Sequence, residues 1–299
     1  MDTSGVFRVD GMVAVITGGG TGIGLTMAKA LAGAGARKVY ILGRRRDVLE
    51  SAASSHAAIV PITCDVCSKE SLQAAVDAVT KDVGFVNLLV ANSGVVGPET
   101  RWQPDLSISE LRAKLFDAVS VDDFTQTYHV NVTGAYFTFL AFLELLDEGN
   151  KNALKGGGGF GAPVVQGSDV PSVQSQVIFT SSIAAYSRAW LSAPAYAGSK
   201  AAIAHLTKHA STQLARYGIR ANAFAPGLFP SELAQGLIAN RDPSKEGPDE
   251  LRFIPARRFG GDEEMAGTIL YLAGRSGAFC NGLILVFDGG KLSTMPSEY

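Results

Sequence analysis

Short runs of β-branched and apolar residues alternate with longer helix-patterned stretches from one end of the chain to the other. This alternation is typical of parallel strands joined by crossover helices. We expect seven strands, over residues 12–17, 38–42, 59–64, 87–91, 176–181, 220–224 and 283–287. Apolar residues at three- and four-residue spacing predict helices over residues 72–79, 121–146, 197–216 and 263–273. The pattern therefore predicts a doubly wound α/β domain, with a parallel sheet flanked by helices on both faces.

Composition and charge narrow the class of protein further. Of the 299 residues, 46% are hydrophobic and 18% are charged, which suits a single α/β domain over residues 1–299. The net charge of −2 gives no positive field that would attract nucleic acid or an anionic membrane. The longest apolar stretch, residues 135–146, is far shorter than the ~20 residues that cross a bilayer, and the start lacks the pattern of a secretory signal. We expect a cytoplasmic protein without nucleic-acid or membrane partners.

Two segments break the alternation of strands and helices. Residues 148–175 contain four consecutive glycines and show neither period, which predicts a long loop insertion. Residues 226–255 hold several prolines around a short helical piece. This second segment follows the sixth strand at its carboxyl end, where ligands bind in open α/β sheets, so we interpret it as a substrate lid.

Neither the cysteines nor the histidines form a convincing metal or redox motif. Cys64 and Cys67 form a C-x-x-C at the end of an apolar strand, and the third cysteine, Cys280, is distant in sequence. Three cysteines fit a reduced compartment better than a disulfide framework. His205 and His209 are one helical turn apart, but no third ligand lies nearby in sequence. We expect no metal site.

A glycine-rich sequence directly follows the first strand. Residues 17–24 read Thr-Gly-Gly-Gly-Thr-Gly-Ile-Gly, and a helix is expected after them. Glycines permit a tight turn and let backbone N–H groups approach a pyrophosphate at the positive end of a helix. The sequence favours dinucleotide binding, although such a turn is also compatible with an ordinary strand-to-helix connection.

A second motif pairs a phenol with an ammonium. Tyr196 and Lys200 are four residues apart, so they share one face of a helix. Taken alone, such a pair could be an ordinary surface pair. However, Ser182 lies at the end of the preceding strand, fourteen residues before Tyr196, and Asn131 interrupts the apolar face of the helix expected over residues 121–146. A buried amide of that kind needs partners inside the protein.

Taken together, these motifs resemble the short-chain dehydrogenase/reductase family over nearly the whole chain. The resemblance implies a Rossmann-type fold. The matching pieces are residues 17–24, Asp65-Val66, residues 91–94, Asn131, Ser182, Tyr196-Ala-Gly-Ser-Lys200 and Pro226-Gly227. Three features depart from the family pattern: the usual Asn-Asn-Ala-Gly reads Ala-Asn-Ser-Gly at residues 91–94, the usual aspartate before that strand is Asn87, and residues 148–175 are inserted.

The resemblance assigns a role to each of four catalytic residues. Tyr196 is the general acid that protonates a carbonyl oxygen, and the base in the reverse direction. Because a free phenol has a pKa of ~10, it is poorly matched to that role at neutral pH. The positive charge of Lys200 favours the phenolate, and its ammonium also holds the cofactor ribose. Ser182 hydrogen-bonds the substrate oxygen, and Asn131 holds the water through which Lys200 exchanges a proton.

The resemblance also assigns contacts to a nicotinamide dinucleotide. At the pyrophosphate we expect Gly18, Thr21, Gly22, Ile23 and Gly24. At the adenosine we expect Asp65, Val66, Asn92 and Gly94. At the carboxamide we expect Pro226, Gly227 and Leu228, with Ser231 in place of the usual threonine, while Tyr196 and Lys200 also contact the cofactor.

The residues after the second strand predict NADP(H) as the cofactor. A carboxylate there would bind the ribose 2′-OH of NAD and repel a 2′-phosphate, but the position holds Gly43. Three arginines follow, and positive charge at a helix N-terminus is unfavourable without an anion. In the family, the first arginine reads the 2′-phosphate, so we assign that role to Arg44 and leave Arg45 as a helper.

The leading hypothesis is an NADPH-dependent ketone reductase, or the same enzyme acting as an alcohol dehydrogenase. Two alternatives are an enzyme of the same fold that catalyses a non-redox step and a cofactor-sensing regulatory protein. Residues expected near the cleft favour a bulky, apolar small-molecule substrate: Tyr186, Trp190, Leu228, Phe229 and Phe253.

The resemblance further implies a homodimer or homotetramer. The helices that carry Asn131 and Tyr196 build the dimer interface in the family. The apolar residues that we expect to point outward from them are Phe137, Phe139, Phe142, Ile203 and Leu206.

Overall fold

The computed structural model describes residues 5–98, 100–155, 159–165 and 167–297. Seven parallel strands form one sheet in the order β3-β2-β1-β4-β5-β6-β7. The strands are β1 (Val13–Thr17), β2 (Lys38–Gly43), β3 (Ile59–Thr63), β4 (Leu88–Ala91), β5 (Gln176–Thr180), β6 (Arg220–Pro226) and β7 (Ile284–Phe287). The strand order reverses between β1 and β4, which is where ligands bind in such sheets. The predicted doubly wound fold is confirmed.

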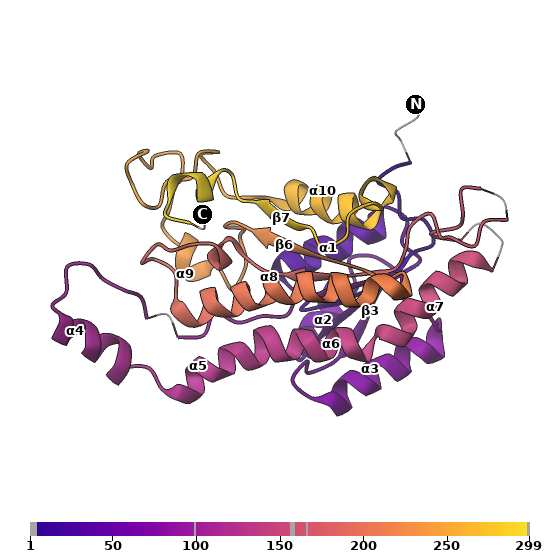
Figure 1. Ribbon diagram of the computed structural model, residues 1–299, viewed down its shortest axis with the longest axis horizontal. Coiled ribbons are helices and arrows are strands. Elements are labelled where there is room, and N and C mark those ends of the chain that lie inside the picture. The colour runs from indigo at the N-terminus through magenta and orange to yellow at the C-terminus, as the bar shows by residue number, and fades with distance from the viewer. Residues whose placement is uncertain (1–4, 99, 156–158, 166, 298–299) are drawn as a thin grey trace.

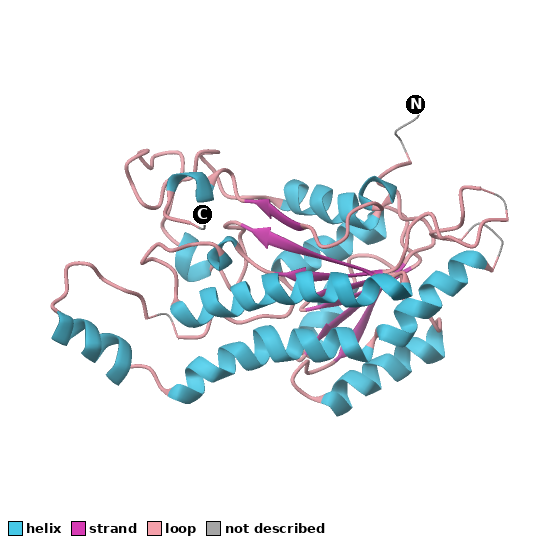
Figure 2. Cartoon of the chain, viewed as in Figure 1, coloured by secondary structure: helices cyan, strands magenta, loops and turns pink. Residues whose placement is uncertain are grey.

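Helices cover both faces of the sheet (Figures 1 and 2). One core cluster packs α1 (Gly22–Gly33), α2 (Arg46–Ala53) and α10 (Asp262–Ala273) against the sheet. The other packs α3 (Lys69–Asp82), α6 (Ala135–Ala141) and α8 (Pro194–Leu214). The remaining helices are α4 (Ile108–Arg112), α5 (Val121–Tyr128), α7 (Leu143–Leu154) and α9 (Gln235–Ile238).

The central strands are apolar along their whole length because both faces are covered. All five residues of β1 and all four of β4 are buried. Such strands show no two-residue alternation, so their sequence signal is a short continuous apolar run between turns. This signal identified the buried strands β1, β4, β5 and β6, and all seven strands were predicted to within one or two residues.

The helix predicted over residues 121–146 is not continuous. After α5, residues His129–Gly134 form a π-helical turn, and α6 ends at Phe142, whose ψ of 4° is not helical. Asn131 lies within this π turn, and its side chain forms hydrogen bonds with the backbone of Val95, which is outside the helix. Turns of this kind interrupt the regular spacing of an α-helix and often occur at functional sites. A continuous apolar pattern does not reveal such a turn.

The predicted loop over residues 148–175 was wrong at its start, because α7 continues to Leu154. Gly149 belongs to this helix: a Cβ there would lie 2.2 Å from the carbonyl oxygen of Val86, so a close approach explains the glycine. The base of the remaining loop is also anchored, since Phe160 and Val173 are buried in the core. The glycines at residues 156–158 lie outside the described residues.

Three side chains that we expected to point outward are buried within the chain itself. Phe139, Phe142 and Ile203 are at most 5% exposed and pack against the sheet. Phe137 and Leu206 are partly buried at the edge of the same cluster. The spacing of apolar residues in the sequence identifies an apolar stripe along a helix. When a helix carries apolar residues on two sides, the spacing does not tell which side faces the sheet.

No single helix among the described residues is long and apolar enough to span a membrane. By length and composition alone, the bent pair Val121–Ala141 and Leu143–Leu154 passes that test jointly, with a bend of 45° between them. Buried residues of these helices, Phe139 and Leu146 among them, belong to the core.

Candidate active site

The turn after β1 requires glycine at specific places. Gly18 and Gly22 have φ values of +65° and +52°, a region that disfavours side chains. A Cβ at Gly24 would lie 2.2 Å from the carbonyl oxygen of Gly18, so the helix can pack closely on the turn only without one. The chain therefore passes tightly from β1 into α1 at the carboxyl edge of the sheet.

The first turn of α1 has no acidic residue and no side-chain cap. The N-cap is Thr21, whose side chain makes no capping hydrogen bond. The first N–H groups of a helix lack intrahelical acceptors and carry a partial positive charge. The cradle of Gly18, Gly22, Ile23 and Gly24 therefore fits a pyrophosphate. Ser231 lies over it, with its Cβ 2.9 Å from where a Cβ of Gly22 would stand.

Asn92 connects three strands under this cradle. Its Nδ2 donates to the carbonyl oxygen of Thr17 at 3.0 Å, and its Oδ1 accepts from the hydroxyl of Thr180 at 3.1 Å. The hydroxyl of Thr17 in turn accepts from the backbone N–H of Asn92 and of Ser93. We had expected Asn92 at the ribose, and its side chain already has these partners inside the protein. Thr17 and Thr180 were not predicted; each is a polar residue at the end of a buried strand.

The start of α8 carries the predicted Tyr-Lys pair. A proline in its first turn, Pro194, has a fixed φ that suits a helix start. The Nζ of Lys200 lies 5.6 Å from the centroid of the Tyr196 ring and donates to the carbonyl oxygen of Thr180 at 2.8 Å. Lys200 is only 4% exposed, and burial lowers the pKa of its ammonium to about 8. The sheet thus holds the ammonium next to the phenol.

Ser182 and Tyr196 are close enough to influence each other. Burial raises the pKa of Tyr196, while its hydrogen bond with the Ser182 side chain acts in the opposite direction. The Ser182 hydroxyl also accepts from the backbone N–H of Ala184 at 3.1 Å, at the start of the 3₁₀ turn Ile183–Ala185. With a raised pKa the phenol is protonated at neutral pH, as a proton donor must be.

Asn131 joins the same cluster from the π-helical turn. Its Oδ1 accepts from the N–H of Val95 at 2.8 Å, and its Nδ2 donates to the carbonyl oxygen of Val95 and to the hydroxyl of Ser199, both at 2.9 Å. A Cβ at Gly94 would lie 3.2 Å from the Oδ1 of Asn131 and 3.4 Å from the Nζ of Lys200. The structure therefore brings all four predicted catalytic residues to one place. Ser199 was missed, although it lies within the Tyr-x-x-x-Lys motif.

The residues that we predicted at the adenine, Asp65 and Val66, directly follow β3. The Oδ1 of Asp65 accepts from the N–H of Cys67 at 3.0 Å, and the N–H of Asp65 donates to the hydroxyl of Ser71. Val66 is buried, and its side chain lies close to Gly134. Burial raises the pKa of both Cys64 and Cys67, so neither is activated as a thiolate.

The three arginines after β2 have different surroundings. Arg45 forms an ion pair with Glu232 at 2.8 Å, and Arg46 pairs with Glu50. Arg44 is exposed, and no hydrogen bond or ion pair holds its side chain within the described parts of the chain. A Cβ at Gly43 would lie 3.5 Å from Leu49, an ordinary contact, so the position has room for a side chain.

The segment that we predicted at the nicotinamide carboxamide, Pro226-Gly227-Leu228, continues from the end of β6. The N–H of Gly227 donates to the carbonyl oxygen of Phe287, and the carbonyl oxygen of Leu228 accepts from Gly260. A Cβ at Gly227 would lie 2.7 Å from the Cα of Asp288, so β7 and β6 meet closely here.

Comparison with protein families decides the classification. A family model described as short chain dehydrogenase matches residues 12–154, and one described as Enoyl-(Acyl carrier protein) reductase matches residues 166–291. The chain belongs to the short-chain dehydrogenase/reductase family. Among curated relatives, Short-chain dehydrogenase/reductase SAT3 of Stachybotrys chartarum is 66% identical over 274 residues, which cover 91% of this chain and 100% of the relative. Galactitol 2-dehydrogenase (L-tagatose-forming) of Cereibacter sphaeroides is 32% identical, over 97% of this chain and 98% of the relative.

Solved structures of the short-chain dehydrogenase/reductase family are similar over almost the full length. A gluconate 5-dehydrogenase from Burkholderia cenocepacia, in complex with NADP and tartrate, is 29% identical with a TM-score of 0.73, and the match covers 96% of this chain and 98% of that one. The Pseudomonas aeruginosa RhlG/NADP active-site complex is 27% identical with a TM-score of 0.74, covering 97% and 99%. Family and fold are thereby established.

The structure explains one departure from the usual short-chain dehydrogenase/reductase pattern. Asn87, in place of an aspartate, is buried, and its Oδ1 accepts from the N–H of Val13 at 2.9 Å. An amide supplies the same acceptor as a carboxylate without burying a charge. Phe229, which we had expected at the substrate cleft, instead packs on Phe287 in the core.

Proposed function

We propose that this short-chain dehydrogenase/reductase uses NADP(H) to reduce the ketone of a bulky, apolar small molecule, or to oxidise the corresponding alcohol. When bound, the cofactor supplies or accepts a hydride at C4 of its nicotinamide. Tyr196 gives its phenolic proton to the carbonyl oxygen, and Ser182 donates a hydrogen bond to the same oxygen. These two hydroxyls are already close to each other in the structure.

Lys200 and Asn131 complete the proposed chemistry. The buried ammonium of Lys200 lies close enough to Tyr196 to favour the phenolate that remains after proton transfer. Because Asn131 and Lys200 flank Gly94, a water held beside them would return a proton from solvent. A protein that only senses the cofactor would not need these four groups in one place.

The observation that carries the choice of NADP(H) is the pair Gly43 and Arg44. Position 43 has room for an acidic side chain, but the residue there is glycine. Arg44 has no anionic partner among the described residues. Arginine matches the geometry of a phosphate, and such charge-assisted hydrogen bonds are worth about 1.5 to 3 kcal/mol each. Two solved relatives contain NADP, which agrees with this proposal.

Cofactor consumption with a panel of ketones tests the reaction. We expect one NADPH to be oxidised for each alcohol formed with bulky aromatic or alicyclic ketones. Product formation without NADPH consumption would instead favour a non-redox enzyme. Cofactor binding without turnover of any carbonyl or alcohol would favour a sensor.

A double substitution tests the cofactor preference. Gly43→Asp with Arg44→Leu should reverse the preference toward NADH, with a change of about 10- to 150-fold in kcat/KM for NADPH. The matched control is Arg46→Leu, because Arg46 is exposed but already paired with Glu50, and it should leave the ratio unchanged. An unmutated protein that uses both cofactors equally, or prefers NADH, would contradict the role of Arg44.

We also propose that the protein forms a homodimer or homotetramer through the face of α5, α6 and α8. With Phe139, Phe142 and Ile203 buried, this face instead presents a shallow cavity of about 440 Å³ between α6 and α8, lined by residues such as Tyr136, Phe137 and Leu206. A stable interface of this kind should bury more than ~1,000 Å². Light scattering at micromolar concentration should show a dimer or tetramer, and a strict monomer would refute the proposal.

A further inference from the structure

The C-terminal segment, residues 288–297, crosses from β7 to the other side of the predicted substrate entrance. It begins where Asp288 packs against Gly227, at the end of β6. At its far end, the backbone N–H of Arg188 donates to the carbonyl oxygen of Pro296 at 2.8 Å, and the Nε of Arg188 donates to that of Ser297 at 2.6 Å. Arg188 follows shortly after Ser182 in the chain. The segment therefore connects the two strand ends that carry the site.

Between these ends, Lys291 attaches the segment to the lid. Its Nζ donates to the carbonyl oxygens of Leu251 at 2.5 Å and Phe253 at 2.9 Å. These bonds join two parts of the chain that are about 40 residues apart in sequence. Lys291 is only 7% exposed. A buried ammonium is costly unless it is hydrogen-bonded, so these two carbonyls are essential to its position.

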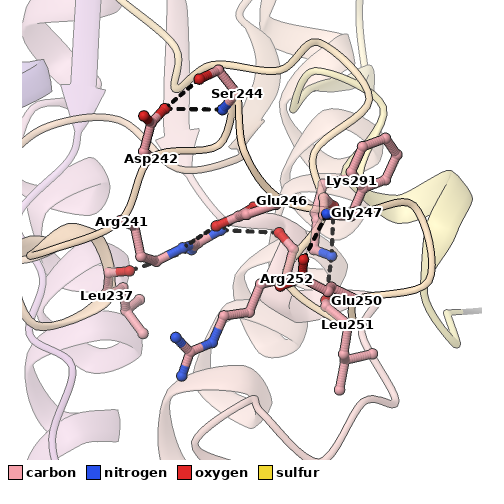
Figure 3. Close-up of polar contacts among 11 residues, drawn as sticks. Leu237, Arg241, Asp242, Ser244, Glu246, Gly247, Glu250, Leu251, Arg252 and Lys291 are labelled. Atoms are coloured by element: carbon pink, nitrogen blue, oxygen red, sulfur yellow. Dashed lines mark hydrogen bonds and ion pairs between the residues drawn. The ribbon is translucent and has the colours of Figure 1, made fainter.

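The lid itself is held by a second buried charge (Figure 3). Arg241 forms a two-pronged ion pair with Glu246 at 2.8 and 3.0 Å, and both side chains are about one-tenth exposed. Arg241 also donates to the carbonyl oxygen of Arg252 at 2.9 Å, next to the carbonyl that Lys291 holds. These bonds therefore fix the backbone of the part of the lid that follows α9, where the chain has no helix or strand.

Backbone geometry shows how closely the segment and the lid fit. Gly289 and Gly290 have φ values of +64° and +85°, and a Cβ at Gly289 would lie 2.9 Å from the Cβ of Ala256. The N–H of Ala256 donates to the carbonyl oxygen of Gly289 at 2.9 Å. Asp288 then accepts from the N–H groups of Gly290 and Leu292, which fixes the turn that aims Lys291 at the lid.

From these contacts we propose that residues 288–297 form a strap across the substrate entrance, and that Lys291 is the residue that positions the lid for substrate. The proposal rests on the proposed function, because it assigns substrate binding to the cleft beside Ser182 and Tyr196. Lys291 acts through the backbone of the lid and does not touch the reacting atoms. Its loss should therefore change the fit of the substrate more than the binding of the cofactor.

The substitution Lys291→Met tests this role, because it keeps the length of the side chain and removes both hydrogen bonds. We expect the KM for the ketone to rise about tenfold, with the NADPH Kd changed by less than about twofold. Hydrogen exchange of the lid backbone over residues 247–255 should become at least about tenfold faster. Lys208→Met is the matched control, since Lys208 also donates to a backbone carbonyl, that of Gly282, away from the lid. It should change none of these quantities.

These measurements distinguish a role of Lys291 in positioning the lid from a general role in stabilising the fold. Unchanged lid exchange with unchanged KM would overturn the proposal, and so would parallel losses in NADPH binding and kcat. If Lys291→Met does not fold, Arg188→Gln decides by the same measurements, because it weakens the strap at its other end. If the unmutated protein reduces no ketone, the proposed function fails, and lid exchange in Lys291→Met alone decides whether the strap holds the lid.

Discussion

The proposed catalytic centre and the proposed adenosine end of the cofactor site lie at the same edge of the sheet, but their polar side chains differ in whether they have partners inside the protein. In the centre, Lys200, Asn131 and Ser182 each have partners inside the protein at 2.8–3.1 Å. At the adenosine end, Arg44 is exposed and has no such partner in the described segments. The groups proposed to act on the reacting atoms are therefore held in place by the protein before a substrate binds. The arginine proposed to recognise a phosphate remains available to bind one.

The first way to test this contrast is to remove the proton donor from the fixed centre. Tyr196→Phe should lower kcat by about 10²- to 10⁴-fold, because general acid catalysis is typically worth that much. The Kd for NADPH, measured by fluorescence, should stay nearly the same, because the phenyl ring keeps its packing. Retention of more than a tenth of the activity would show that Tyr196 is not the acid.

The second test measures how much the buried ammonium of Lys200 lowers the free energy of unfolding. Burial lowers the pKa of Lys200 to about 8, so the folded protein holds this proton less tightly than the unfolded chain does. Below pH 8 both states are protonated and the full cost of the buried ammonium applies. Between pH 8 and about 10.5 only the unfolded chain keeps the proton, so the contribution to stability rises with pH. Lys200→Met should therefore stabilise the protein at pH 7.

We expect a gain of about 1 to 3 kcal/mol at pH 7 that largely disappears by pH 10, measured by urea unfolding. Lys208→Met, which changes an exposed lysine, should show no such dependence on pH. A loss of stability at both pH values would mean that the hydrogen bond to Thr180 outweighs the cost of burial.

The third and smallest effect concerns the open end of the site. Arg45 pairs with Glu232 of the lid, and both side chains are more than half exposed, at 58% and 62%. Because an ion pair between exposed side chains contributes little to stability, Glu232→Gln should free Arg45 without destabilising the fold. We expect two- to fivefold tighter NADPH binding, unchanged NADH binding, and a loss of the effect at high salt.

Glu263→Gln on α10 removes the same charge elsewhere and serves as the control. Equal effects of both substitutions would show that only the net charge matters. If neither changes NADPH binding, Arg45 has no part in recognising the 2′-phosphate, and Arg44 remains the single proposed contact.

Local patterns in the sequence were sufficient to predict the sheet and to find the residues that we propose as catalytic. Buried parallel strands appear as short apolar runs, and glycines with positive φ are needed at fixed places after β1. Tyr196 and Lys200 lie on one helix, so their spacing alone places them together. These features depend on residues that are close in sequence.

Features that depend on distant contacts were not predicted. The π-helical turn around Asn131 reflects bonds to Val95 and Ser199, and the extension of α7 reflects the approach of Gly149 to Val86. Lys291 resembles an ordinary surface lysine in the sequence, because nothing local shows that the lid will cover it. In each of these three features, contacts between residues that are distant in sequence determine the structure. A single sequence does not reveal such contacts.

The bonds that assemble the catalytic centre also bear on how the chain folds. The hydrogen bond from Asn131 to Ser199 spans 68 residues, and the one from Thr180 to Asn92 spans 88. Closing such long loops costs entropy before any contact compensates for it, so pairings of this kind slow folding. Helices can form early from local contacts, but the four groups that we propose as catalytic meet only when β4, β5 and α8 are in place. Enzymatic activity should therefore return late in refolding, after most of the helical signal has recovered.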